Sequence, residues 1–230
     1  MSDNQFFLLQ VNDALFPVGG YSHSQGLETY IQNGIVHNEA TAREYILHKL
    51  KWSLAYTDLL AVRLAYERAT ENDLDGLLHL EQLLEVSRIP SEQREAVRKM
   101  GSRFAKTIEN LGLPISKSGI FRDYLDTRKA RMVSHCCIYG VFCAAMDIPL
   151  SDALSHYLYA QTSAMVTNCV KTIPLSQTSG QKILSSCYEC FKEILSGVLT
   201  WTEDDLCLSV PGFDIRGIQH EKLYSRIYMS

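Results

Sequence analysis

The sequence has no excess of positive charge and no hydrophobic run long enough to cross a membrane. Lysine and arginine total 22 against 26 aspartate and glutamate residues, and the formal net charge is -4. We therefore do not expect nucleic acid as the main partner, because this charge gives no global attraction to phosphate, although it leaves room for a local basic patch. The most apolar run, Cys136 to Met146, is far shorter than the roughly 20 residues of a membrane span. Residues 1–5 carry no positive charge, so we expect a cytoplasmic protein rather than a secreted one.

The sequence also has little proline, and it lacks the alternation of apolar and polar residues that is typical of strands. Apolar residues instead recur at helical intervals, which predicts an all-α fold that forms a single-domain multi-helix bundle over residues 1–230. We expect a helix that begins at Leu27 behind a cap from Ser22 or Ser24, and another capped by Ser91. The predicted helical ranges are 40–69, as one helix or two in series, and 73–86, 94–110, 133–146, 151–170 and 177–199.

Charge is unevenly distributed along these predicted helices. Residues 61–131 hold 24 Asp, Glu, Lys and Arg residues, whereas residues 132–200 hold seven. The charge-poor helices must be covered, because exposed apolar surface is unfavourable in water. They either form the centre of the fold alone or also supply a subunit interface.

Three patterns suggest catalysis, and each has a simpler interpretation. The segment from Gly112 to Ser118 resembles a phosphate-binding loop but has a serine where the second glycine belongs, so we expect a connection between helices. Ser179 and Lys182 have the spacing of a lysine-activated serine, yet no companion motif is present, and we expect Ser179 to cap a helix. Asp13, His23 and Ser24 could be drawn as a triad, but sequence spacing says nothing about their geometry.

The seven cysteines are an odd number without the regular spacing of a disulfide framework, so reduced thiols are the simplest reading. Cys187 and Cys190 form a C-x-x-C pair, and His135 to Cys137 adds soft ligands, which leaves a metal-binding carrier as an alternative. These cysteines lie in apolar helical stretches, where a thiol behaves as a small hydrophobe. We therefore expect packing residues and no metal site.

Residues 211–230 combine aromatic, aliphatic and basic residues at the end of the chain, where order is usually lost. This C-terminal tail either packs on its own core or docks in a groove on a partner, for which aromatic and arginine anchors are typical. Both alternatives apply, one after the other, if the tail becomes ordered when it binds a partner.

The loop from Leu15 to Glu28 places three glycines and a proline beside aromatic residues, which indicates one defined backbone shape. Together with the segments 168–181 and 211–230 and the helix around Tyr139 and Gly140, it resembles the urease accessory proteins of the UreF type. This resemblance covers essentially the whole chain. Ser176 departs from it, because the family often has glycine there.

The resemblance implies an all-α, non-catalytic nickel-insertion chaperone with no cofactor and no metal site of its own. It would be an adaptor between a UreD/UreH-type scaffold protein and the UreG-type GTPase that loads nickel into apo-urease, and would form a homodimer. By the resemblance, scaffold docking falls to Ile215, Arg216, His220, Tyr224 and Arg226. We expect the GTPase to face Gly19, Gly20, Tyr21, Ser22, His23, Gln177 and Gln181.

Overall fold

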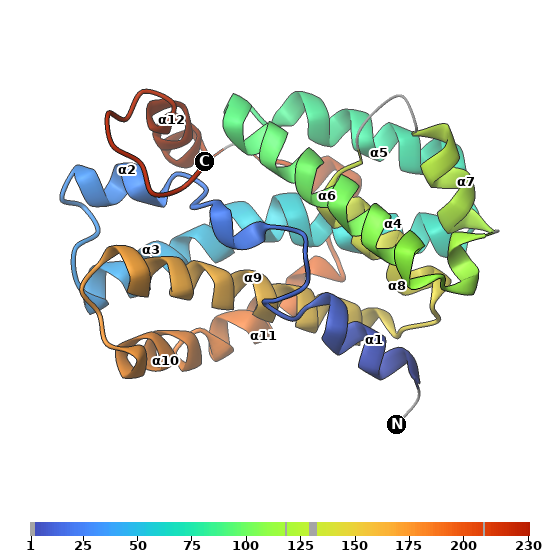
Figure 1. Ribbon diagram of the computed structural model, residues 1–230, viewed down its shortest axis with the longest axis horizontal. Helices are drawn as coiled ribbons and strands as arrows, with labels where there is room; N and C mark the ends of the chain where they lie inside the picture. The colour runs from blue at the N-terminus through green and yellow to red at the C-terminus, as the bar shows by residue number, and fades with distance from the viewer. Residues whose placement is uncertain (1–2, 118, 129–132, 209) are drawn as a thin grey trace.

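The computed structural model describes residues 3–117, 119–128, 133–208 and 210–230, with the side chains of Asp3 and Tyr21 outside the description. Within these ranges the chain is a bundle of helices without strands, which confirms the predicted all-α class (Figure 1). The α-helices are α1 (Asp3–Val11), α2 (Leu27–Gln32), α3 (Glu39–Lys49), α4 (Leu60–Thr70), α5 (Leu74–Ser87), α6 (Ser91–Leu111), α7 (Ile120–Thr127), α8 (His135–Ala145), α9 (Leu150–Thr172), α10 (Gln177–Ser185), α11 (Tyr188–Val198) and α12 (Pro211–His220). Short 3-10 turns η1 (Gly20–Ser22), η3 (Pro114–Ser116) and η4 (Glu203–Asp205) join some of them.

The helix predicted over 40–69 is one continuous helical rod from Glu39 to Thr70. Its middle is η2 (Leu50–Leu59), a π-helical segment between α3 and α4. A π-helix is wound more loosely than an α-helix and is frequent at functional sites. This change in winding explains why the apolar residues in the range 40–69 do not all recur at the spacing of a regular α-helix.

Helix α8 lies at the centre of the fold, and its residues from His135 to Cys143 are all buried. Gly140 allows α8 to approach α4 closely, because an added Cβ would lie 2.5 Å from the Val62 carbonyl oxygen. Central packing therefore accounts for the charge-poor sequence of this helix. The neighbouring Glu81 carboxylate is also buried, and it accepts hydrogen bonds from the Ser134 N–H at 2.9 Å and the Ser134 hydroxyl at 2.7 Å.

Several local predictions were wrong. The range 177–199 is two helices, because the chain turns at Ser186 and Cys187 between α10 and α11. Ser22 and Ser24 do not cap α2, whose N-cap is Gly26 at φ 88°. Ser91 is the first residue of α6 rather than its cap. Ser179, which we expected to cap a helix, lies in the first turn of α10 instead. The N-cap of α10 is Ser176, whose hydroxyl accepts from the Ser179 N–H at 3.0 Å.

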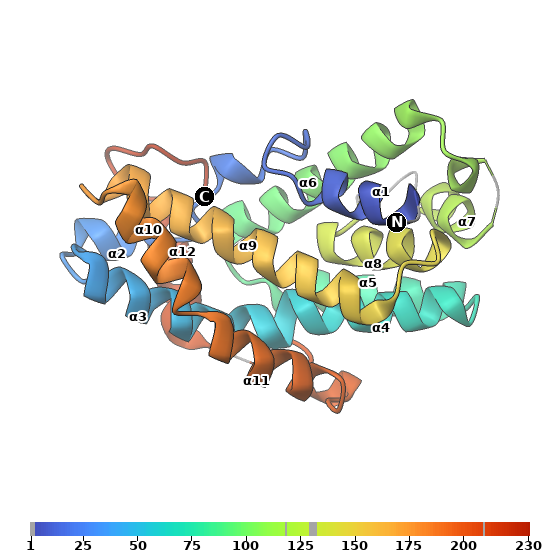
Figure 2. The ribbon, with the colours of Figure 1, turned by 90° about the horizontal axis from the view of Figure 1, so that it is seen from below.

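Helix α9 runs through the molecule between its two ends, and α3, α10 and α11 pack along it (Figures 1 and 2). Helices α2 and α12 lie side by side at the end of the bundle that also holds α3 and α10. Segments near the start and the end of the chain therefore meet there. None of the helices in the described part of the chain is long and apolar enough to span a membrane.

Candidate functional site

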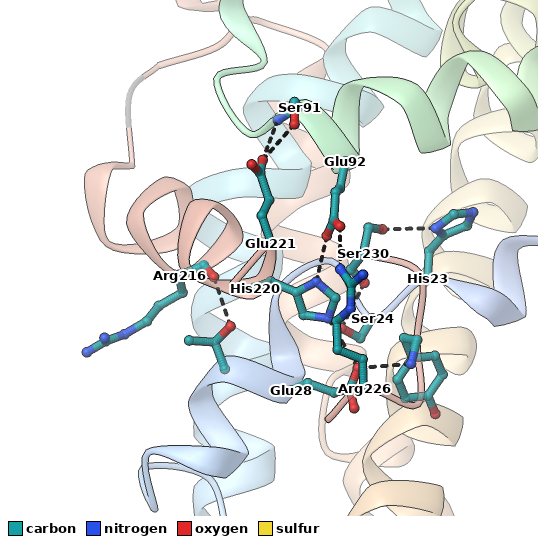
Figure 3. Close-up of polar contacts among 12 residues, drawn as sticks. His23, Ser24, Glu28, Ser91, Glu92, Arg216, His220, Glu221, Arg226 and Ser230 are labelled. Atoms are coloured by element: carbon teal, nitrogen blue, oxygen red, sulfur yellow. Dashed lines mark hydrogen bonds and ion pairs between the residues drawn. The ribbon is translucent and has the colours of Figure 1, made fainter. Parts of the chain in front are cut away.

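The C-terminal tail, residues 211–230, lies on the chain's own N-terminal loop and on the start of α6 (Figure 3). Helix α12 packs against α2, and the residues after His220 return over α2 to reach Ser24. We call the combined surface of residues 15–28 and 211–230 the loop-tail surface. The first alternative for the tail, packing on its own core, describes this structure.

Glu28 is the central polar residue of the loop-tail surface. Its buried carboxylate accepts hydrogen bonds from the backbone N–H groups of Ile227 at 2.7 Å and Tyr228 at 2.9 Å. It also lies 3.1 Å from Nε2 of His220, which is fully buried. A buried carboxylate is stable only when such partners replace its lost hydration. The contacts of Glu28 therefore fix the position of the tail on α2.

The start of α6 supplies the second set of contacts to the tail. Glu92 Oε2 lies 2.7 Å from His220 Nδ1, and its Oε1 accepts from Arg226. Ser91 donates from its backbone N–H at 3.0 Å and its hydroxyl at 2.8 Å to the Glu221 carboxylate. The ring of His220 thus faces a carboxylate on each side, one from α2 and one from α6 (Figure 3).

The last residues of the tail bind to the backbone of the loop. The carbonyl oxygen of Ser230 accepts from the N–H groups of Ser24 at 2.6 Å and Gln25 at 2.9 Å, and the Met229 N–H donates to the Ser22 carbonyl at 2.9 Å. The Ser230 hydroxyl lies 2.9 Å from His23 Nδ1. Burial, followed by the charges of Arg103 and Lys99, lowers the pKa of His23, which favours its neutral form.

Two glycines allow the loop and the tail to approach each other. At Gly26 a Cβ would lie 3.3 Å from the Gly217 nitrogen, and φ is 88°, a conformation that other residues rarely adopt. At Gly217 a Cβ would meet the side chains of Gln93 at 2.5 Å and Pro90 at 2.8 Å. The glycines of both motifs are therefore needed for packing between α2, α6 and α12.

The outer side of the tail presents apolar and aromatic side chains to solvent. Tyr224 is fully exposed, and Ile227 is 73% exposed. Ile215, Ile218 and Met229 are also exposed large hydrophobic residues. The backbone and buried side chains hold the tail on the chain, whereas these outer side chains are exposed to solvent in the described structure. An exposed set of this kind is typical of a protein interaction site.

The structure brings together the loop at residues 15–28, the tail at residues 211–230 and the beginning of segment 168–181. Asn168 in α9 donates from its side-chain amide to the His23 carbonyl at 3.0 Å, so segment 168–181 begins at the loop. Gln177 and Gln181 lie further away on α10, exposed at the same end of the molecule. The prediction that all seven residues from Gly19 to Gln181 face one partner is left open by this arrangement.

The remaining predicted site residues occupy different environments. Gly19 is buried beside Arg103, Gly20 begins η1, and the Ser22 hydroxyl donates to the Gly19 carbonyl at 2.7 Å. The Tyr21 side chain lies outside the described part of the structure. Arg216 lies over the Tyr30 ring, with its guanidinium carbon 5.7 Å from the centroid. His220 is buried, so a partner could contact it only after the tail moves.

The catalytic patterns do not assemble in the described residues. Asp13 accepts from the Leu15 N–H at 2.7 Å, and Ser24 donates to the Ser230 carbonyl at 2.9 Å, so neither is bonded to His23 as a triad requires. Ser179 bonds to the Ser176 hydroxyl at 3.0 Å rather than to Lys182. The segment from Gly112 onward connects α6 to η3 and α7, as expected, and does not follow a strand.

The cysteines are unpaired, and all except the half-buried Cys207 are buried. Burial raises the pKa of Cys187 to about 11 and also raises the pKa of Cys190. Metals bind the thiolate, which a raised pKa disfavours. Among the described residues, no group of three or more His, Cys, Asp and Glu side chains is arranged to hold a metal ion. This geometry gives the metal-carrier alternative no support.

Sequence reasoning missed the carboxylates that hold the tail. Glu28 lies within the loop motif, but its role could not be seen because its partners are nearly 200 positions away, at 227 and 228. Glu92 and Glu221 carry no signal that separates them from ordinary surface charges. Only the packing of α2, α6 and α12 brings them together.

Comparison with known proteins places the chain in a family. The UreF family model matches residues 36–188. The urease accessory protein UreF of Lachnoclostridium phytofermentans is 35% identical over 226 residues, which cover 97% of this chain and 97% of the relative. The structure and these similarities define an all-helical accessory protein. The chain belongs to the UreF family of urease accessory proteins.

Proposed function

We propose that this protein is a non-catalytic adaptor in urease maturation. It would join a UreD/UreH-type scaffold to the UreG-type GTPase that delivers nickel to apo-urease. The observation that carries the proposal is the exposed apolar side of the tail, held in place by the buried contacts of Glu28 and His220. A surface that is apolar outside and fixed inside is pre-organised for a protein partner, which lowers the entropic cost of binding.

Scaffold docking is assigned to the tail, with Tyr224 and Ile227 as apolar anchors and Ile215 and Arg216 beside them. Tyrosine and arginine are frequent among the residues that dominate binding energy. Arg226 and His220 would act from beneath by holding the tail on α6 and α2.

GTPase contact is assigned to the loop and to Gln177 and Gln181 on α10. The loop borders a groove of about 340 Å³ that lies against α9. The lining of this groove includes Met100, Tyr159 and Met165. Methionine and tyrosine at a groove are well suited to receive an apolar side chain from a partner. This groove supports a second, separate interaction surface.

A homodimer and a cytoplasmic location complete the proposal. The free cysteines suit a reducing compartment, because disulfides are rare in the cytosol. The mechanism is positioning: the adaptor biases the GTPase by binding its nucleotide states with different affinity.

Co-purification of the three components tests the adaptor role. We expect the full chain to form a dimer-based complex with scaffold and GTPase, with its mass read by light scattering. Tyr224→Ala combined with Ile227→Ala should remove the scaffold, whereas Gln177→Ala combined with Gln181→Ala should remove only the GTPase. Tyr188→Ala, at an exposed tyrosine of α11, is the matched control. Retention of both partners by the first two double variants would contradict the assigned surfaces.

A further inference from the structure

A cavity of about 210 Å³ lies on the side of the molecule formed by η2, the turn between α5 and α6, and the chain entering α12. Its lining includes Lys49, Asp58, Arg88, Gln93, Phe213 and Asp214. Four of these six side chains are charged. The cavity is distinct from the apolar side of the tail, and nothing in the adaptor proposal uses it.

Lys49 is the unusual residue of this cavity, because its ammonium is buried without an ionic partner. It is 4% exposed, and in the described part of the chain its Nζ makes no hydrogen bond and no ion pair within 4.0 Å. Its Nζ lies over the Phe213 ring, 4.6 Å from the ring centroid. Burial lowers the pKa of Lys49 to about 8, although the charges of Asp58 and Asp214 act in the opposite direction. A buried ammonium normally has a counter-ion.

The two carboxylates of the cavity do not supply that counter-ion. Asp58 accepts from Arg88 Nη2 at 2.6 Å and from the Thr57 hydroxyl at 2.9 Å, and it forms no ion pair with Lys49 within 4.0 Å in the described structure. Burial raises the pKa of Asp214, while Lys49 and Arg88 act to lower it. Asp214 forms no ion pair with Lys49 within 4.0 Å in the described structure.

Two further donors at this cavity are also unsatisfied. Arg88 Nε and Gln93 Nε2 are buried and have no hydrogen-bond acceptor among the residues that the structure describes. A buried donor without an acceptor costs free energy, and natural proteins keep few of them. Three donor groups, two of them on cations, therefore line one cavity without matching acceptors. A ligand that supplies several acceptors and negative charge would satisfy all three.

We propose that this cavity binds a small oxyanion, such as inorganic phosphate or the carboxylate of a small organic acid. Lys49 is its counter-ion, and Gln93 and Arg88 donate hydrogen bonds to it. The volume exceeds that of a few water molecules, since one water occupies roughly 30 Å³ in the liquid. This proposal does not depend on the adaptor role.

Asp214 gives the proposal a directional consequence. Its carboxylate lines the same cavity and attracts the same ammonium, so it competes with an incoming anion. Asp214→Asn removes this competition and should tighten phosphate binding. Lys49→Met removes the counter-ion with little change in length and should weaken it by about tenfold or more, which is the usual worth of a charge-assisted contact.

Isothermal titration of the full chain with sodium phosphate, against sodium chloride of equal ionic strength, tests these expectations. Lys51→Met is the matched control, because Lys51 is two positions away but more exposed, and pairs with Glu193 at 2.6 Å. We expect saturable binding in the wild type and in Lys51→Met, binding weakened by about tenfold or more in Lys49→Met, and tighter binding in Asp214→Asn. Titration with sodium acetate distinguishes a carboxylate ligand from phosphate.

A second measurement applies if Lys49→Met does not fold. In wild-type protein with ¹³C-labelled lysine, saturation with phosphate or acetate should shift the Lys49 Cε resonance and raise its midpoint of titration. Absence of saturable binding of both anions overturns the proposal. Equal binding by wild type and Lys49→Met, or an unmoved Lys49 resonance at saturation, also overturns it.

Discussion

Nε2 of His220 lies 3.1 Å from Oε2 of Glu28, although the two residues are 192 positions apart in the chain. The same Glu28 carboxylate accepts the backbone N–H groups of Ile227 and Tyr228. One side chain of α2 therefore holds both the end of α12 and the segment that follows it. A substitution at Glu28 should therefore destabilise the tail more than the rest of the bundle.

Glu28→Gln should destabilise the tail, because an amide cannot replace the charge or all the acceptors of the carboxylate. We expect a loss of about 3 kcal/mol in the free energy of unfolding, the scale for weakened hydrogen bonds to a buried charged group. Amide hydrogen exchange at Ile227 and Tyr228 should accelerate more than exchange in α8. Glu44→Gln, at an exposed position of α3, is the control and should change stability by less than about 0.5 kcal/mol. Unchanged protection of the tail amides would refute this role of Glu28.

Gly26→Ala should destabilise the protein more than Gly34→Ala. Both glycines have positive φ, 88° and 69°, so both variants incur backbone strain of about 1 kcal/mol. Only at Gly26 does the new Cβ also meet backbone, 3.3 Å from the Gly217 nitrogen, whereas it meets open space at Gly34. Urea unfolding measures the difference, which we expect to be about 1 kcal/mol from the added crowding. Equal losses would show that α2 and α12 separate without cost.

The buried Lys49 predicts that stability rises with pH through an alkaline window. Its pKa is about 8 in the folded chain, against an ordinary value of 10.5. Between these values the unfolded chain binds more protons, so raising the pH favours the folded state. The full gain is about 3 kcal/mol and is complete above the unfolded pKa.

Denaturant unfolding of wild type and Lys49→Met from pH 7 to pH 10 isolates this contribution. Tyrosines and cysteines titrate in the same range, but they do so in both proteins, so the difference reports Lys49. We expect Lys49→Met to be the more stable protein at pH 7, with the gap narrowing as the pH rises. Parallel stability curves would mean that Lys49 titrates normally.

Nickel binding should not depend on the C-x-x-C pair. Burial raises the pKa of Cys187 to about 11, so its thiolate is scarce at neutral pH. We expect equilibrium dialysis at pH 7 to give the same nickel occupancy for wild type and for Cys187→Ser combined with Cys190→Ser. Tight stoichiometric binding that this double variant abolishes would instead favour the carrier function.

The regular helices could be predicted from the sequence, because their information is local. Helices α5 (Leu74–Ser87) and α6 (Ser91–Leu111) lie close to the predicted ranges 73–86 and 94–110. The helix ends built from distant contacts could not be predicted. Ser91 has the side chain of a cap, but the Glu221 carboxylate takes its hydroxyl instead.

The candidate site was predictable as a set of motifs and not as a geometry. The glycines of the loop indicated a fixed backbone, and Gly26 indeed supports a close approach to Gly217. The sequence did not show that the loop packs against the tail. This packing depends on charged residues at positions 28, 92 and 221, which look like ordinary surface residues in the sequence. The buried and unpaired state of Lys49 was equally invisible, because it depends on three separate segments.

The attachment of the tail to Glu28 also sets an order of events during synthesis. Glu28 leaves the ribosome early, but its carboxylate cannot accept the N–H groups of Ile227 and Tyr228 until those residues have been synthesised. Contacts between such distant positions close a very long loop and form late in folding. The loop-tail surface is therefore completed only after the bundle has folded. A chain that ends before Ile227 would lack the donors that bind Glu28 and would not display this surface to partners.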